Sequence, residues 1–278
     1  MRALTLIVAR QQQRRPLMTT EDFIIELFCR IDDQMKGISK HPQANLYPGE
    51  IVTLAILFAI KGVGNRAFYR WLVRDWLGLF PKLPERTRLF RLFKTHQAWT
   101  NRFLADPTVL GVADTYGIEL LHPYREGRSD KQIGKKGLSN HRWIVGGKLC
   151  FVLNQFGLIT GWDCNTANVY DATFHPLIRL FEDRMIVLVD HGFFSKQGNP
   201  ENMKVCNRGT WNVRMIIETV LSMLTTICHF KRSAHRVWQY FKSRLAYTIA
   251  AFNILVQWHG LKPDDNGFIH LSLAEFSL

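Results

Sequence analysis

The chain has 278 residues, and 36 Lys and Arg against 23 Asp and Glu give it a formal net charge of +13. This excess favours a polyanionic partner such as DNA, and membrane is the weaker choice because the longest apolar run, residues 51–60, is far shorter than the roughly 20 residues that span a bilayer. Five scattered cysteines without a CxxC pair exclude a disulfide framework and a zinc knuckle, so we expect a soluble cytoplasmic protein that joins the nucleoid when bound to DNA.

Residues 1–18 form a basic tail that we expect to be disordered. The tail holds four arginines and no acid, and it lacks the apolar core of a secretion signal. Met18 is a natural start for the folded part. The tail is therefore either an upstream extension or a nonspecific arm that binds phosphate groups.

Residues 19–106 are expected to form an all-helical domain, because apolar residues recur there at intervals of three and four. A candidate helix-turn-helix and a basic stripe predict that this domain binds DNA. Helix, glycine turn and helix over residues 49–77 indicate a candidate helix-turn-helix. Its second helix carries a basic stripe, Arg66, Arg70 and Arg74, which is either a face that contacts phosphates or an ordinary solvated surface. Helices are predicted from Thr20, from Pro48 to the glycines at 62–64, from Asn65 to Leu77 and from Glu85 to Leu104.

Strand signals replace the helical pattern after Pro107, where we place the start of a second domain, residues 107–260, followed by a C-terminal tail, residues 261–278. The sequence predicts a mixed five-stranded sheet flanked by helices, an α/β arrangement. Strands are predicted at 109–116, 143–153, 158–164, 184–190 and 203–206, with a four-residue hairpin turn at 154–157. Helices are predicted from 171–176 to 181, over 211–229 and over 234–258.

A polar loop is predicted between residues 122 and 140. It is too basic and too poor in apolar residues to join a core, so it is a mobile surface loop, a clamp on the DNA backbone, or both. Its basic residues are Arg125, Arg128, Lys131, Lys135 and Lys136.

Three carboxylates stand at the edge or in the middle of apolar segments. Asp114 follows the first strand signal, Asp190 closes the apolar run 185–189, and Glu218 lies within the apolar helical run 215–224. A buried charge is costly unless it is paired or bound to metal. Glu218 is therefore either neutralised by a partner or exposed at a working site.

The predicted topology brings these acids together. When a strand heads a meander and a crossover helix then leads to a parallel fourth strand, strands one and four lie side by side. That adjacency would bring Asp114 and Asp190 to the end of the sheet where α/β proteins bind ligands, and a helix packed there could present Glu218. Clustered carboxylates repel one another unless cations neutralise them, and ligands that are all oxygen favour two Mg²⁺ or Mn²⁺ ions.

In the order strand, strand, helix, Asp114, Asp190 and Glu218 resemble the DDE triad of insertion-sequence transposases with an RNase H-like catalytic core, members of the retroviral-integrase superfamily. Residues 190–193, Asp-His-Gly-Phe, are similar to the Asp-x-Gly-aromatic sequence at the second acid of this family. The resemblance covers residues 108–258. It implies that the three acids hold metals that activate water to nick transposon ends and then activate the freed 3′-hydroxyl to attack target DNA.

Around Glu218 the chain approximates the signature of one transposase branch: Tyr, two residues, Arg, three residues, Glu, six residues, Lys. Arg214 and Glu218 match it, whereas Trp stands in place of Tyr and Thr225 in place of Lys. The resemblance implies that Arg214 contacts a phosphate near the cleaved end, while Lys231 and Arg232 partly substitute for the missing lysine.

Ordinary structural interpretations exist for the same residues. Asp190 alone could be a turn or capping residue, and Arg214 and Glu218 have the spacing of an intrahelical ion pair. Trp211 could stack on an unpaired base or pack in the core. Four further acids are interpreted as surface or capping residues: Asp163, Asp171, Glu182 and Asp183.

The expected function is that of a DDE transposase that cuts double-stranded DNA at terminal inverted repeats and joins the ends to target DNA. We expect a homodimer in the synaptic complex. One alternative is a metal-dependent nuclease on the same fold. The other is a catalytically inactive, transposase-derived protein that binds DNA with or without metal.

Overall fold

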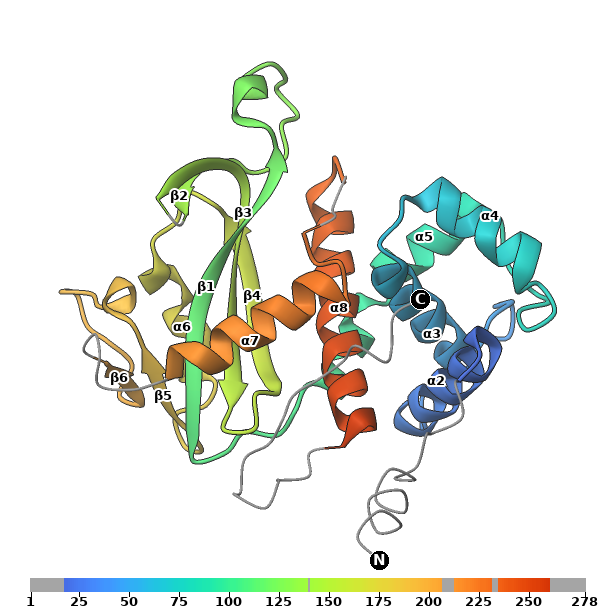
Figure 1. Cartoon of the computed structure of the whole chain (residues 1–278), viewed down its shortest axis with the longest axis horizontal. Helices are drawn as coiled ribbons and strands as arrows, with labels where there is room; N and C mark the ends of the chain where they lie inside the picture. Colours follow the sequence, from blue (N-terminus) through green and yellow to red (C-terminus); the bar gives the residue numbers. More distant parts are fainter. Residues whose placement is uncertain (1–17, 140, 207–212, 232–234, 261–278) are drawn as a thin grey trace, which may run out of the picture.

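The computed structural model describes residues 18–139, 141–206, 213–231 and 235–260. In Figure 1 a curled sheet lies at the left, helix α8 (Trp238–His259) stands beside it, and helices α2 to α5 lie beyond α8 at the right. Most of the predicted tail 1–18 and all of the predicted tail 261–278 lie outside the described residues.

The helices before the sheet begin at or within one residue of their predicted starts. The first of them opens with a capping box, in which the Thr19 hydroxyl accepts a hydrogen bond from the Asp22 N–H at 3.1 Å and the Asp22 carboxylate accepts one from the Thr19 N–H at 3.3 Å. The bounds are α2 Thr20–Gln34, α3 Pro48–Lys61, α4 Asn65–Asp75 and α5 Arg86–Thr95, followed by the 3₁₀ helix η2, Gln97–Phe103.

Helix α3 is apolar on every side and is buried along almost its whole length. It ends at Gly62, whose φ of +64° is the left-handed conformation that favours glycine, and the chain then bends by 117° into α4. Within the described residues, no single helix is both long and apolar enough to cross a membrane, although α3 and α4 pass that test of length and composition as a bent pair.

A hydrophobic core extends from α3 through α8 to one face of the sheet. Phe58 of α3 packs against Phe68 and Phe90, with ring centroids 5.1 and 4.9 Å apart. The same cluster of buried residues includes Phe252 of α8 and Phe151 of the sheet. The helical part and the sheet therefore share a core, and the division into domains near residue 107 stays a prediction.

The sheet combines an antiparallel meander with two parallel strands. β3 pairs antiparallel with β1 and β4, β1 pairs in parallel with β5, and β5 pairs in parallel with β6. The predicted hairpin and the predicted contact between the first strand and the strand at 184–190 are confirmed. The bounds are β1 Leu110–Leu121, β2 Lys135–Ser139, β3 Arg142–Asn154, β4 Ile159–Thr166, β5 Ile186–Val189 and β6 Met203–Val205.

The loop prediction for residues 122–140 is wrong in its second part, because Lys135–Ser139 form β2. This strand pairs with residues 142–146 of β3, and β4 pairs with residues 147–153 on the same edge. The sheet has six strands instead of the predicted five. It is still five strands wide, because β2 and β4 lie one after the other along the same edge of β3. The buried position of β2 is Gly137, where a Cβ would overlap the neighbouring backbone, and Leu138 is exposed, so no buried apolar side chain indicates this strand in the sequence.

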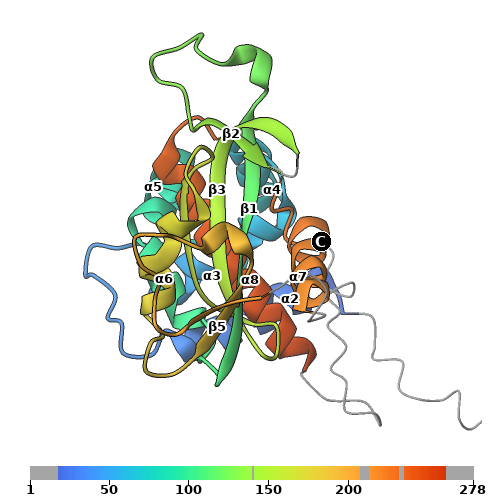
Figure 2. The same ribbon diagram turned by 90° about the vertical axis from the view of Figure 1, so that its left-hand side faces the viewer.

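Helices cover both faces of the sheet. The short helix α6 (His175–Arg179), preceded by η4 (Asp171–Phe174), packs on one face with buried residues of β1, β3 and β5. Helices α7 (Val213–Thr226) and α8 pack on the other face, and Figure 2 shows α6 and α8 on opposite sides of the strands. Two further 3₁₀ helices are η3, Pro123–Arg125, and η5, His191–Phe193.

Asn253 of α8 joins the helical layer to the sheet. Its side chain is fully buried, and its Oδ1 accepts a hydrogen bond from the Ile159 N–H at 2.9 Å. Its Nδ2 donates to the Ile159 carbonyl at 2.7 Å and to the Phe103 carbonyl at 2.8 Å. One amide therefore satisfies backbone groups at the start of β4 and at the end of η2.

Replacing Asn253 by Ala is expected to lower the free energy of unfolding by about 2–4 kcal/mol, because backbone groups at β4 and η2 lose their buried partners. The measurement is urea unfolding of the purified protein. Gln257→Ala, an exposed site one turn further along α8, is the control and is expected to change the free energy by less than about 0.5 kcal/mol. A loss below about 1 kcal/mol for Asn253→Ala would mean that the amide does not hold the layers together.

Candidate active site at the end of strands β1 and β5

Asp114 lies on β1, and Asp190 directly follows β5, the parallel strand beside β1. Val112 of β1 and Leu188 of β5 are register partners, and Asp114 and Asp190 each follow two residues later. Neighbouring strands lie about 4.8 Å apart, so the backbones that carry the two acids run side by side. The predicted adjacency of the two strands is confirmed, and the convergence of the two carboxylates stays a prediction.

The Asp190 side chain acts as a helix cap in this structure. Its Oδ1 accepts a hydrogen bond from the Gly192 N–H at 3.0 Å at the start of η5, and the residue is exposed. A Cβ at Gly192 would overlap the carboxylate of Asp171. The glycine of the Asp-His-Gly-Phe sequence is therefore required by the close approach of Asp171.

Glu218 lies on the exposed side of α7. The core-facing side of the helix carries three buried side chains, those of Ile217, Val220 and Leu224. The carboxylate within the apolar run is therefore not buried in the core. Spacing decides this outcome, because Glu218 falls between core positions of the helix.

Asp114 and Glu218 line one cavity of about 360 Å³, which we call the acid cavity. Lys231, an exposed residue beyond α7, lines it as well. Tyr116, two residues after Asp114 on β1, completes this side, and the Lys231 Nζ lies 5.1 Å from the centre of its ring. The structure thus brings together two of the predicted acids and one predicted phosphate-binding lysine.

Asp190 is not among the residues that line the acid cavity. In the described part of the chain, no three His, Cys, Asp or Glu side chains are grouped so that they could hold one metal ion. The carboxylate of Asp190 would have to leave its cap hydrogen bond to join Asp114 and Glu218.

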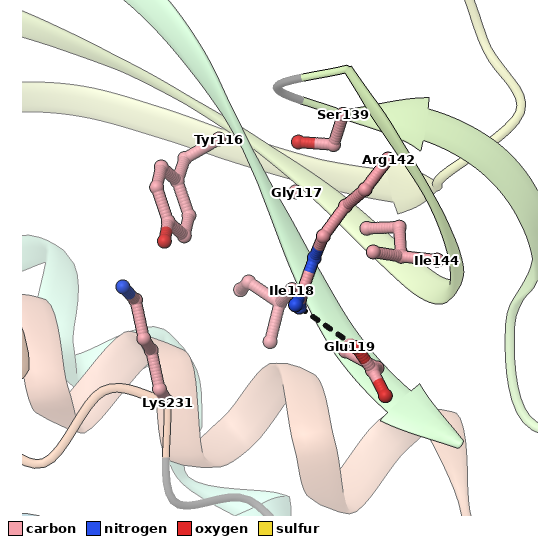
Figure 3. Close-up of a pocket in the computed structure, with 8 residues that line it drawn as sticks. All are labelled: Tyr116, Gly117, Ile118, Glu119, Ser139, Arg142, Ile144 and Lys231. Carbon is pink, nitrogen blue, oxygen red and sulfur yellow. Dashed lines mark hydrogen bonds and ion pairs between the residues drawn. The ribbon is translucent and has the colours of Figure 1, made fainter. Parts of the chain in front are cut away.

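A second cavity of about 340 Å³ continues along β1 from the acid cavity and shares Tyr116 and Lys231 with it. Figure 3 shows Lys231 reaching toward the Tyr116 ring, with Arg142 and Glu119 at the other end of the cavity. Arg142 and Glu119 form an ion pair at 2.8 Å. The wall between the two cavities therefore carries the positive charge of Lys231.

A polar network lies on the opposite face of β1. The Asp171 Oδ1 accepts hydrogen bonds from the Thr115 hydroxyl and from the Lys148 ammonium group, each at 2.9 Å. The two charged side chains are only 21% and 13% exposed, so interpreting Asp171 as a surface or capping acid was wrong. A lysine in the middle of the apolar strand at 143–153 was the signal that could have revealed the pair.

The same network contributes to the chemistry of Cys150. Burial, helped by the nearby carboxylates of Asp114 and Asp171, raises the pKa of the Cys150 thiol well above its usual range. A thiol with such a pKa stays protonated at neutral pH. Cys150 is therefore a core residue and not a nucleophile.

The basic residues predicted to contact DNA lie on exposed surfaces. Arg66, Arg70 and Arg74 are exposed on α4, and Arg74 forms an ion pair with Asp75 at 2.6 Å. The five basic residues between 125 and 136 are exposed too, and the Lys136 Nζ lies 3.1 Å from a Glu126 carboxylate oxygen. Trp211, Arg232 and the side chain of Arg214 lie outside the described residues.

No protein-family model matches the chain, and no curated protein matches it either. A function is therefore inferred from the residues of the chain themselves. The acid cavity and the exposed basic surfaces are the features that bear on it.

Replacing Gly192 by Ala is expected to lower the free energy of unfolding by about 1–3 kcal/mol, because Asp171 is held by Lys148 and Thr115 and cannot give way freely. Denaturant unfolding gives the value. The control is Gly78→Ala, where a Cβ meets nothing within 4 Å, and the expected change there is below about 1 kcal/mol. Equal effects of the two substitutions would contradict the role assigned to Asp171.

Proposed function

We propose that the chain is a DDE transposase that cleaves the DNA ends of an insertion sequence and transfers them to target DNA. The observation that carries the proposal is the acid cavity, where Asp114 of β1 and Glu218 of α7 meet although they are far apart in the sequence. Asp190 follows the parallel strand next to β1 at the matching position. This arrangement supports a common role for the three acids.

The order of strands supports an RNase H-like core. Such a core was expected to combine a meander with a parallel strand beside the first one, and β1, β3, β4 and β5 follow that order. Asp114 lies on β1 just past the residues that pair with β5, Asp190 directly follows β5, and Glu218 lies on α7. In α/β sheets the carboxyl end of the parallel strands is the usual place for ligands.

The donor chemistry of the acids suits Mg²⁺ or Mn²⁺. Asp114 and Glu218 offer carboxylate oxygens, the ligands that these ions prefer, and Asp190 can add its own once it releases the Gly192 N–H. When bound, two ions supply an activated water or 3′-hydroxyl and stabilise the leaving oxygen. Lys231 offers a positive charge to a phosphate group that enters the acid cavity.

The geometry of α3 and α4 supports DNA contact by the N-terminal helices. Residues 62–64 join them, the chain bends by 117° there, and the second helix exposes Arg66 and Arg70. A helix-turn-helix joins two helices at about 90–120° through three or four residues. We propose that α4 contacts DNA in this way.

Glu218→Gln and Asp114→Asn are expected to reduce cleavage by more than about 100-fold, since even outer-shell partners of metal ligands are worth 10–100-fold. The substrate is linear DNA that carries the sequences flanking the gene, incubated with Mg²⁺ or Mn²⁺, and the products are separated on a denaturing gel. Glu182→Gln, an exposed acid on the α6 side, is the matched control and should cleave as the wild type does. Full cleavage by Glu218→Gln would contradict the mechanism.

The same assay separates the alternatives. Hydrolysis of the DNA without joining to a target would identify a nuclease on the same fold. Binding that is equal with and without metal, together with no cleavage, would identify an inactive DNA-binding derivative. Both outcomes would overturn strand transfer as the function.

Replacing Arg125, Arg128 and Lys131 together by Gln is expected to weaken DNA binding without changing the fold, because all three are exposed. The slope of log K against log salt should fall by about 0.9 for each residue that contacts a phosphate. Fluorescence anisotropy with a labelled duplex at several salt concentrations gives the slope. Arg184→Gln, an exposed arginine between α6 and β5, is the control, and an unchanged slope in the triple variant would remove the loop from the DNA interface.

A further inference from the structure

A cavity of about 740 Å³ opens between the turn from α3 to α4, the start of α5 and the start of α8. We call it the three-helix cavity. Its described lining includes four cationic side chains and no acid. The cationic residues are Arg86, Lys231, Arg236 and Arg244.

Three helices begin at this cavity, and none of them has a side-chain cap. Gly64 stands at the N-cap of α4 and Val237 at that of α8, and Glu85 at the N-cap of α5 accepts no hydrogen bond from the helix through its side chain. The first N–H groups of a helix have no partner within the helix and carry a partial positive charge. Three such ends around one space favour an anion, and phosphate is the anion that they commonly bind.

Arg244 forms the buried floor of the cavity. Only 7% of the residue is exposed, its Nη1 donates to the Val63 carbonyl at 3.4 Å, and its Cζ lies 4.4 Å from the centre of the Phe58 ring. Its Nη2 is buried and has no hydrogen-bond partner among the described residues. The guanidinium thus keeps one donor unused beside a cavity that it lines.

Burial is unfavourable for this guanidinium, since the described lining of the cavity offers it no acid. Burial lowers the pKa of Arg244 to about 10, so the group is still charged at neutral pH. A buried charge with an unused donor is destabilising unless a ligand completes it. An anion in the cavity would give this charge a partner.

Lys231 connects the three-helix cavity to the acid cavity, because it lines both. Arg236 and Arg86 add charge at the rim, and Arg236 is exposed. A chain of phosphates could therefore pass from the rim to Asp114 and Glu218 without meeting another acid of the described lining. DNA provides such a chain, whereas a free phosphate fills only the floor.

We propose that the three-helix cavity binds backbone phosphates of the DNA strand that enters the acid cavity, with Arg244 as the donor at its floor. This inference rests on the proposed function and adds to it the place where the strand is held. The turn between α3 and α4 then has two roles, since it orients α4 and supplies the N-terminus of that helix to the phosphate.

The first test uses inorganic phosphate and needs no DNA. Phosphate is expected to raise the melting temperature of the wild type by several degrees over sodium chloride of equal ionic strength, because a ligand stabilises the state that binds it. Arg244→Met, which keeps an apolar side chain against Phe58, should lose this rise, and Arg236→Gln should reduce it. Equal rises in the wild type and in both variants would overturn the site.

The second test uses a labelled DNA duplex in fluorescence anisotropy. Arg244→Met and Arg236→Gln are each expected to weaken binding at least tenfold and to lower the salt slope by about 0.9 per lost phosphate contact. Arg179→Gln, an exposed arginine of α6 on the opposite face of the sheet, is the control and should bind as the wild type does. Because Arg236 is exposed, its variant tests the site even if Arg244→Met fails to fold.

The two tests separate failure of this site from failure of the proposed function. Normal DNA binding by Arg244→Met and Arg236→Gln, with no phosphate effect on melting, would overturn the site and leave the transposase proposal standing. An effect of phosphate on melting that depends on Arg244, in a protein that binds no DNA, would overturn both the assignment to DNA and the proposed function. It would leave a site for a small phosphate compound.

Discussion

The hydrogen bonds of Asn253 are the constraint on which the arrangement of the molecule depends. Helix α8 is packed between the sheet and the N-terminal helices, and hydrophobic contacts alone would let it slide along its axis. The amide of Asn253 fixes the height of the helix against β4 and η2. The position of α8 in turn sets the start of that helix beside the turn from α3 to α4, where the three-helix cavity opens. A single buried amide thus links the core to the distant cationic surface.

Much of the fold could be predicted from the sequence, because its signals are local. The apolar run of α3, the glycine after it and the hairpin turn at 154–157 each determine their own backbone, and the structure has them where they were predicted. β2 could not be predicted, since its inward position is a glycine that is needed for contact with a distant segment. Such a contact leaves no periodic pattern in the sequence.

The candidate site was predicted only in part for a related reason. The pairing of β1 with β5 follows from general rules of topology, so the adjacency of these two strands could be foreseen. The direction of a side chain depends on competing partners, and for Asp190 the Gly192 N–H is such a partner. The pair of Lys148 and Asp171 was missed because a partner on another element decides whether an acid is at the surface.

The strand pattern has a consequence for the behaviour of the protein at high concentration. β2 and β4 divide one edge of the long strand β3 between them, and the buried side chain of Asn253 hydrogen-bonds the backbone of Ile159, the first residue of β4. The opposite edge ends in β6, which is only three residues long. Long unpaired edges promote intermolecular strand addition, and short or covered edges suppress it. The short edge at β6 therefore offers little template for the addition of a strand from another molecule.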